Sequence, residues 1–112
     1  MPSTTVPVIF RCWPNGDVLA LFPTWPHDYA GTLCTSYAHV GQHGAADYEH
    51  VLSRTRPASP DQYASLLQEL RVIGYDNLQV YRRASHIFHK ARRCVAEYNR
   101  REDARLLDAL AS

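Results

Sequence analysis

Residues 6–22, VPVIFRCWPNGDVLALF, decide how we interpret the fold of this chain. Residues 6–13 and 18–22 are rich in apolar, β-branched and aromatic side chains, which is typical of strands. The four residues between them, Pro-Asn-Gly-Asp, favour a tight turn, because Gly and Asn tolerate positive φ and Pro presets φ. The segment therefore predicts a β-hairpin. Because both arms are apolar at almost every position, we expect the hairpin to be covered on both faces or to lie centrally.

Three further segments suit strands. Residues 32–39 alternate in character, so Tyr37 and Cys34 should point to opposite faces of a sheet. Residues 48–55 and 78–83 are the fourth and fifth predicted strands.

Two connecting segments read as loops. Residues 23–31 contain two prolines and a glycine, and Trp25 and Tyr29 make this loop aromatic, so we expect it either to fold back over the core or to offer a contact surface. The glycines of residues 41–47, GQHGAAD, favour a turn or irregular loop.

A helix is well marked over residues 60–73. Ser59 suits the N-cap, Pro60 the first helical position, and Gln62 completes a capping box. Gly74 suits the C′ position that ends the helix. With the strands that flank it, this helix is consistent with a βαβ unit.

Residues 84–110 are also helical in composition. Their apolar residues form two stripes that do not join in phase, so we expect a bend, a break or fraying near residues 99–103. The first stripe is Ile87, Ala91, Cys94 and Tyr98, at spacings of four, three and four, and the second is Leu106, Leu107 and Leu110.

Together these segments predict one α+β domain over residues 1–112. The predicted order is β-β-β-β-α-β-α, with a mainly antiparallel sheet and helices packed on one face. Residues 1–83 form the expected core, and residues 84–112 a C-terminal helical extension that is first basic and then acidic. A chain of 112 residues with 46% apolar content can bury a core of its own.

The chain shows no sign of a membrane span or of export. No stretch approaches the about 18 consecutive apolar residues that a spanning helix needs. The N-terminus, MPSTTVPVIF, has no basic segment followed by a long apolar one, so we expect a cytoplasmic protein. Cys12, Cys34 and Cys94 are widely spaced, which favours free thiols over disulfides.

Charge is concentrated in the second predicted helix. Residues 82–101 carry seven basic residues against Glu97 alone, whereas residues 102–112 carry Arg105 against three acids. Arginine clusters bind phosphates and carboxylates, although a solvated helix face is an equally good interpretation. The candidate contact residues are Arg82, Arg83, Lys90, Arg92, Arg93, Arg100 and Arg101, together with Trp25 and Tyr29.

A second candidate site is the stretch around CTSYAHVGQHGAAD, residues 34–47. His39 and His43, with Cys34 and His50, have the side-chain types of a zinc site. Cys34 with a nearby histidine could also act as nucleophile and base. Glycines in this stretch argue against a shared helix, and Cys34 and His39 should point to opposite faces, so a structural strand and turn is the favoured interpretation.

Three segments carry a resemblance: FRCWPNGDVLALFP, CTSYAHVGQHGAAD and SRTRPASPDQYASLLQELRVIGYDNLQV. Together they resemble a family of small uncharacterised proteins of bacterial phages, plasmids and integrated mobile elements. The resemblance covers roughly residues 6–83. It implies no activity and no residue roles. It implies a setting in which accessory proteins bind host or element proteins, including components of defence systems.

These observations favour a non-enzymatic interaction protein. No phosphate-binding loop, dinucleotide fingerprint or paired-carboxylate motif occurs, and we expect no cofactor. The expected partner is another protein, and the chain is expected to be a monomer or homodimer. One alternative is a DNA- or RNA-binding protein that uses the Arg-rich helix. Another is a small metal- or thiol-dependent enzyme at Cys34, His39 and His43.

Overall fold

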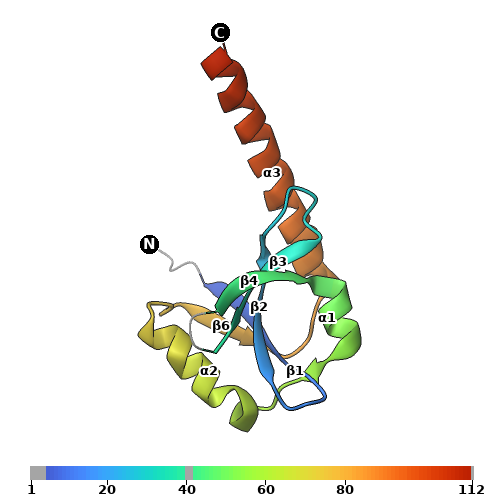
Figure 1. The fold of residues 1–112 in the computed structure, drawn as a ribbon, viewed down its shortest axis with the longest axis vertical. Coiled ribbons are helices and arrows are strands. Elements are labelled where there is room, and N and C mark those ends of the chain that lie inside the picture. The colour runs from blue at the N-terminus through green and yellow to red at the C-terminus, as the bar shows by residue number, and fades with distance from the viewer. Residues whose placement is uncertain (1–4, 40–41, 112) are drawn as a thin grey trace.

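A mainly antiparallel sheet forms the centre of the protein, as the computed structural model of residues 5–39 and 42–111 shows (Figure 1). The strands lie in the order β4-β3-β2-β1-β5, and β6 pairs with β1 in parallel. The strands are β1 (Val6–Cys12), β2 (Val18–Pro26), β3 (Leu33–Ala38), β4 (Gln42–Asp47), β5 (Arg56–Pro57) and β6 (Leu78–Tyr81). The helices are α1 (Tyr48–Arg54), α2 (Pro60–Val72) and α3 (His86–Ala111). This confirms the α+β class and the predicted order, to which α1 and β5 are additions.

The predicted hairpin is present and occupies the middle of the sheet. Ile9 pairs with Leu21 across β1 and β2. The turn is closed by hydrogen bonds from the Trp13 amide to the Asp17 carbonyl (2.8 Å) and from the Gly16 amide to the Trp13 carbonyl (2.9 Å). Gly16 has a φ of 95°, which a glycine adopts without strain.

Two separate apolar clusters cover the two faces of this hairpin. On one face, Phe10, Phe22 and Tyr37 pack with Leu66 and Leu70 of α2. On the other face, Ile9, Leu21 and Cys34 pack with α1 and with Phe88 of α3. The prediction that all helices lie on one face is therefore wrong. Successive residues of β1 point to opposite faces, so an apolar strand needs cover on both.

Strand β2 continues through the segment that we expected to be a loop. Its register against β3 shifts between Phe22 and Pro26, and Pro26 pairs with Cys34. A bulge of this kind tolerates proline, which cannot donate a ladder hydrogen bond. Strand β2 therefore takes up residues 23–26 of the predicted loop, and residues 27–31 lie outside the strand.

The predicted fourth strand is wrong in position. Residues 48–54 form α1, and β4 lies just before it, where we expected a turn. The Asp47 side chain caps α1 by accepting a hydrogen bond from the His50 amide (3.1 Å), with Glu49 in the first turn and Arg54 in the last. Of the glycines that suggested the turn, Gly44 pairs with Ser36 in the ladder, and residue 41 lies outside the described ranges.

The helix α2 confirms its sequence signals. Ser59 and Gln62 form the reciprocal capping box, Pro60 opens the helix, and Gly74 follows its end with a φ of 121°. The strands before and after α2, β5 and β6, both pair with β1. Strand β5 pairs with the end of β1 and β6 with its first part, so α2 connects two strands that share β1 as their neighbour.

The last helix, α3, differs most from expectation. It is continuous over 26 residues, with no break at residues 99–103. Its buried residues are Arg92 and Ala96, whereas Ile87, Cys94 and Tyr98 of the first apolar stripe are exposed and Ala91 is half-buried. Its C-terminal half projects from the body, and residues 103–111 are all exposed (Figure 1). Among the described residues, no helix combines the length and the apolar content of a membrane crossing.

Candidate functional site

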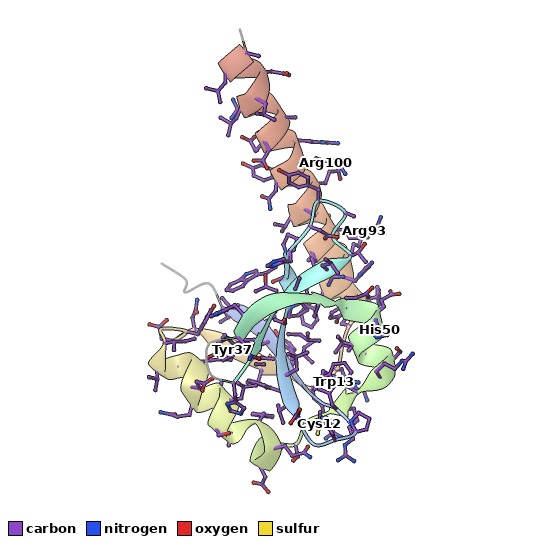
Figure 2. All side chains as sticks on the ribbon, in the orientation of Figure 1. Cys12, Trp13, Tyr37, His50, Arg93 and Arg100 are labelled. Carbon is purple, nitrogen blue, oxygen red and sulfur yellow. The ribbon has the colours of Figure 1, made fainter. Side chains whose placement is uncertain are left out.

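The histidines and cysteine of the possible metal site are separated by the sheet. His43 contacts the Tyr37 ring edge-on (centroids 4.6 Å apart) and the Tyr75 hydroxyl (3.2 Å), whereas His39 lies 3.6 Å from a Glu69 carboxylate oxygen. His50 is exposed on α1, well away from Tyr37 (Figure 2). Within the described ranges, no three His, Cys, Asp or Glu side chains come together as metal ligands would.

Cys34 is fully buried on the opposite face of the sheet from the Tyr37 side chain. Burial raises the pKa of its thiol to about 11, against an opposing effect of the nearby Arg92. A thiol with so high a pKa is almost entirely protonated at neutral pH and is a weak nucleophile. The sheet separates Cys34 from His43, because His43 contacts the Tyr37 ring and Tyr37 lies on the opposite face from Cys34.

Trp25 is partly buried and packs against the apolar cluster that α2 covers. Its ring stacks on Phe22 (centroids 4.8 Å apart) and lies 6.1 Å from the Tyr75 ring. Because β2 extends through this residue, Trp25 lies against the core, as one of the two expectations for this segment had it, and outside the pocket described below.

Arg92, predicted as a surface contact, is the largest fully buried side chain of the described residues. Its Nε donates to the Gly31 carbonyl (2.7 Å) and its Nη1 to the Pro23 carbonyl (2.8 Å). Its guanidinium carbon lies 4.5 Å from the centre of the Tyr48 ring. A side chain held in this way cannot contact a partner, so the prediction for Arg92 is wrong.

Arg92 forms no ion pair with a carboxylate of residues 5–39 or 42–111, so its buried charge is balanced by carbonyl dipoles and the Tyr48 ring. Its desolvation lowers the pKa of the guanidinium. Arg92 also donates from Nη2 to His89 Nδ1, which fixes the His89 tautomer that carries its proton on Nε2. Beneath it, the Tyr48 hydroxyl is buried without a hydrogen-bond partner among the described residues, and burial raises the pKa of Tyr48 to about 12.

Gly31 allows the connection between β2 and β3 to press against α3. Its φ is 77°, and a Cβ at this position would stand 2.9 Å from Arg93 Cα and 3.4 Å from Ala96 Cβ. A side chain would therefore be strained by its backbone conformation and would collide with the helix. The Gly31 carbonyl that accepts from Arg92 completes this close contact.

An open pocket of about 340 Å³ lies where this connection meets α3. Tyr29 and Ala30 form one wall, and Arg93 and Arg100 come from α3, beside the connection (Figure 2). The full lining is Tyr29, Ala30, His89, Lys90, Arg93, Cys94, Glu97 and Arg100. Four of the predicted contact residues (Tyr29, Lys90, Arg93 and Arg100) therefore meet in one place.

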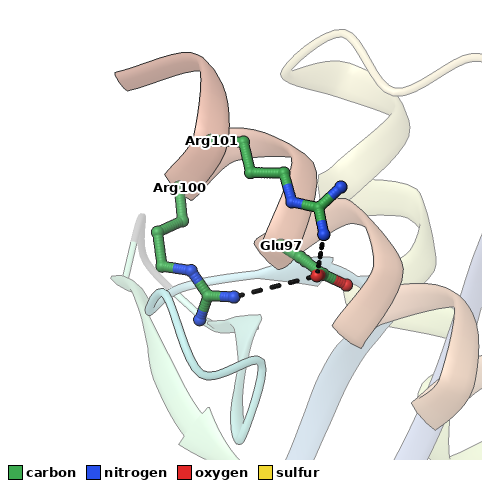
Figure 3. Close-up of polar contacts among 3 residues, drawn as sticks. All are labelled: Glu97, Arg100 and Arg101. Atoms are coloured by element: carbon green, nitrogen blue, oxygen red, sulfur yellow. Dashed lines mark hydrogen bonds and ion pairs between the residues drawn. The ribbon is translucent and has the colours of Figure 1, made fainter. Parts of the chain in front are cut away.

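The pocket is positively charged, with three cations against one carboxylate. That carboxylate, Glu97, is shared by two arginines: Arg101 Nη2 lies 2.7 Å from its Oε1 and Arg100 Nη2 4.0 Å (Figure 3). Lys90 and Arg93 have no ion-pair partner within the described ranges. The pocket can therefore accept an anionic group without first breaking an ion pair of either residue.

Tyr29 sits at the outer rim of the pocket. It is 54% exposed, and its hydroxyl donates a hydrogen bond to the Asp103 carboxylate of α3, which raises the pKa of Tyr29. This hydrogen bond joins the β2–β3 connection to the C-terminal half of α3. The exposed part of the phenol ring can contact a ligand in the pocket.

The remaining predicted basic residues lie elsewhere. Arg82 lines a different pocket with Phe10 and Tyr63, and Arg83 is exposed in the bend between β6 and α3. Arg101 is 76% exposed and bonds Glu97 from outside the pocket. The Arg-rich segment is therefore not one continuous surface.

Two residues that shape this region were not singled out from the sequence: Gly31 and Tyr48. Gly31 carried a usable signal, because an isolated glycine after an aromatic loop often marks a close backbone approach. The sequence does not connect Tyr48 with Arg92, because the two residues are about 40 positions apart. It does not connect His89 with Arg92 either, because their contact depends on which face of α3 is buried.

A comparison of this chain with protein-family models, with curated proteins and with solved structures finds no match.

Proposed function

We propose that this chain is a non-enzymatic interaction protein that binds an acidic segment of a partner protein in the pocket between the β2–β3 connection and α3. The observation that carries the proposal is the meeting of Tyr29 with Lys90, Arg93 and Arg100 around one open cavity. Tyrosine and arginine are the residue types that most often anchor protein interfaces. Arg93 offers a free fork of donors to a carboxylate.

The pocket is held rigid by the buried contacts behind it. Arg92 fixes α3 to the carbonyls of Pro23 and Gly31, and the same guanidinium orients His89 at the pocket wall. A preorganised site loses less entropy when a ligand binds. The α+β body then serves as a scaffold for this surface.

The setting of the proposal comes from the resemblance of residues 6–83 to small proteins of mobile elements. In that setting the partner is a host or element protein, and a component of a host defence system is one such target. Acidic surface segments are common enough on proteins that the pocket chemistry alone does not select among them.

Nucleic-acid binding is the second candidate function, since the same three cations would neutralise phosphates. The charge pattern favours it less. The run of basic residues along α3 is interrupted by four acidic residues, namely Glu97, Glu102, Asp103 and Asp108. Because Arg92 is also buried, no continuous basic track follows α3.

The two candidates are separated by one set of variants. Fluorescence anisotropy measures binding of a polyglutamate peptide, a DNA duplex and single-stranded RNA to the wild type, to Arg93→Gln/Arg100→Gln and to Arg54→Gln/Arg71→Gln. The last variant removes the same charge from exposed positions on α1 and α2. We expect the pocket variant to bind the peptide at least about tenfold more weakly, since two charge-assisted contacts are lost, and the control to bind like the wild type.

Equal loss of peptide binding in both variants would show that net charge and not the pocket is responsible, and would contradict the proposal. Tight binding of duplex or RNA that weakens steeply with salt, with no peptide binding, would favour the second function. A protein captured from native cells by the wild type and the control, but lost from the pocket variant, would identify the partner.

A further inference from the structure

The outward face of the first half of α3 carries an apolar stripe that the body does not cover. Ile87 is 64% exposed and Tyr98 is 65% exposed, and Cys94 between them is exposed as well. We name the outer stripe by its four residues, Ile87, Ala91, Cys94 and Tyr98. Val95, 42% exposed, widens it on one side.

The spacing of the outer stripe is that of a coiled-coil seam. Its residues follow one another at intervals of four, three and four, the alternation that places side chains on one line facing a second helix. The two central residues, Ala91 and Cys94, are small, and the two outer residues are large. Small central residues let two helix backbones approach closely.

We propose that the outer stripe is a dimer seam, and that it pairs with the outer stripe of a second copy of this chain in antiparallel orientation. In this register Ile87 faces Tyr98 of the second copy, and Ala91 faces Cys94. Each large residue then fills the space beside another large one at the ends, while the small residues meet in the middle.

The charged residues beside the seam favour a second copy of this chain as the partner, and they favour the antiparallel direction. Lys90 and Glu97 flank the seam on the same side, and antiparallel pairing sets each Lys90 beside Glu97 of the other copy, where it joins Arg101 at that carboxylate. Two complementary pairs form by symmetry. In a parallel pair, Glu97 would instead lie beside Glu102 of the other copy, which is repulsive.

The distribution of charge along α3 points the same way. The segment around its start is basic, with Arg82, Arg83 and Lys90, and its end is acidic, with Asp103 and Asp108. Antiparallel pairing brings the acidic end of one copy toward the basic start of the other. Parallel pairing would place like charges together.

This inference goes beyond the proposed function and does not depend on it. The seam borders the pocket, since Cys94 of the seam and the flanking Lys90 and Glu97 also line it. Arg93 and Arg100 lie on the side of α3 that faces the β2–β3 connection, so the dimer covers one edge of the pocket and leaves these two arginines in it. Since four seam residues per copy bury much less area than a standard interface, the dimer is weak and forms at high protein concentration.

Disulfide trapping tests the register. Cys94 is exposed while Cys12 and Cys34 are buried, so it is the reactive thiol of the folded chain. A tagged Ala91→Cys/Cys94→Ala variant is mixed with the wild type under mild oxidation. We expect a covalent heterodimer joined from residue 91 to residue 94, which trypsin releases as one peptide pair because Arg92 and Arg93 separate the two positions. Each protein alone should give much less covalent dimer.

Charge exchange tests the partner. Lys90→Glu alone and Glu97→Lys alone should each weaken self-association about tenfold, and an equal mixture of the two should restore it, because only the mixed dimer pairs opposite charges on both sides. Sedimentation up to about 1 mM protein reports the association. A chain that stays monomeric throughout, or a wild type that crosslinks rapidly through Cys94 to Cys94, would overturn the proposal. Neither result affects the peptide-binding measurement above.

Discussion

Along α3, residues 86–96 lie against the sheet, and residues 97–111 project from it (Figure 1). The first half carries Arg92 and Ala96, both essentially inaccessible to solvent. The second half carries three leucines that are between 52% and 83% exposed. Arg92 is therefore buried at a position where a leucine would be expected, and the three leucines are exposed to solvent.

The difference between Arg92 and its neighbour Arg93 shows what decides these positions. They are adjacent in sequence and about 100° apart around the helix. Arg92 finds two carbonyls and an aromatic ring in its direction, and Arg93 finds an open pocket. Residue type alone does not separate a structural arginine from a binding one.

The largest effect should come from breaking the contact of Arg92. Arg92→Ala leaves the carbonyls of Pro23 and Gly31 without their donors and opens a cavity, so we expect the free energy of unfolding to fall by about 3 kcal/mol or more. Arg93→Ala, its matched control at an exposed position, should change it by less than about 0.5 kcal/mol. Urea denaturation followed by circular dichroism measures both. Similar losses in the two variants would mean that α3 is rotated from the orientation described.

The packing beneath the first half of α3 should also make stability depend on pH in the alkaline range. Folding raises the pKa of Cys34 from 9.0 to about 11, so the folded state holds its proton where the unfolded state releases it. The contribution is complete below pH 9 and is lost as pH rises to 11, with a fall in the free energy of unfolding of about 2–3 kcal/mol. Tyr48 adds a further fall as pH approaches 12.

Denaturation of the wild type and of Cys34→Ala at pH 8, 9, 10 and 11 measures this dependence. The variant starts from a lower stability but should lose less between pH 9 and 11. Parallel curves for the two proteins would show that Cys34 is not desolvated by folding.

A smaller effect is expected at the contact between the β2–β3 connection and α3. Gly31→Ala places a Cβ 2.9 Å from Arg93 Cα at a φ of 77°, and should lower the free energy of unfolding by about 2 kcal/mol. Gly44→Ala is the control, since its Cβ would meet only Ser36 Oγ at 3.6 Å and its backbone is extended. Thermal denaturation compares the two. If Gly31→Ala were as stable as Gly44→Ala, the connection would not lie against α3.

The smallest effect should follow from removing the projecting end. A chain that stops after Asp103 keeps the Tyr29–Asp103 hydrogen bond, and residues 104–111, which it lacks, are all exposed. We expect the free energy of unfolding to change by less than about 0.5 kcal/mol, as for other exposed positions. A marked loss of stability in urea would contradict the view that residues 104–111 make no packing contribution to the body.

Much of the fold follows from local chemistry that the sequence displays. The Pro-Asn-Gly-Asp turn and the Ser59 capping box are short-range devices, and both form as predicted. The fourth strand was misplaced because Asp47 acts as an N-cap, and a capping aspartate beside glycines also resembles a turn. The apolar hairpin predicted cover on both faces, and the expectation of helices on a single face conflicted with it.

The candidate site was less predictable, for a physical reason. The orientation of α3 depends on contacts between residues far apart in sequence, such as Arg92 with Pro23 and Gly31. The stripe of Ile87, Ala91, Cys94 and Tyr98 has the apolar periodicity of a core face, and periodicity cannot tell a face that meets the sheet from one that meets another molecule. Tyr29, Lys90, Arg93 and Arg100 were predicted one by one as contact residues, and their convergence on one pocket depends on the fold.

Hydrogen exchange along α3 tests the central claim most directly, namely that this one helix is anchored by Arg92 in its first half and free in its second. The measurement uses mass spectrometry on protein dilute enough to be monomeric. Amides of residues 90–97 should exchange slowly, close to the rate set by global unfolding, and those of residues 104–111 should exchange within seconds. Uniform fast exchange along α3, or protection that extends through residue 111, would contradict it.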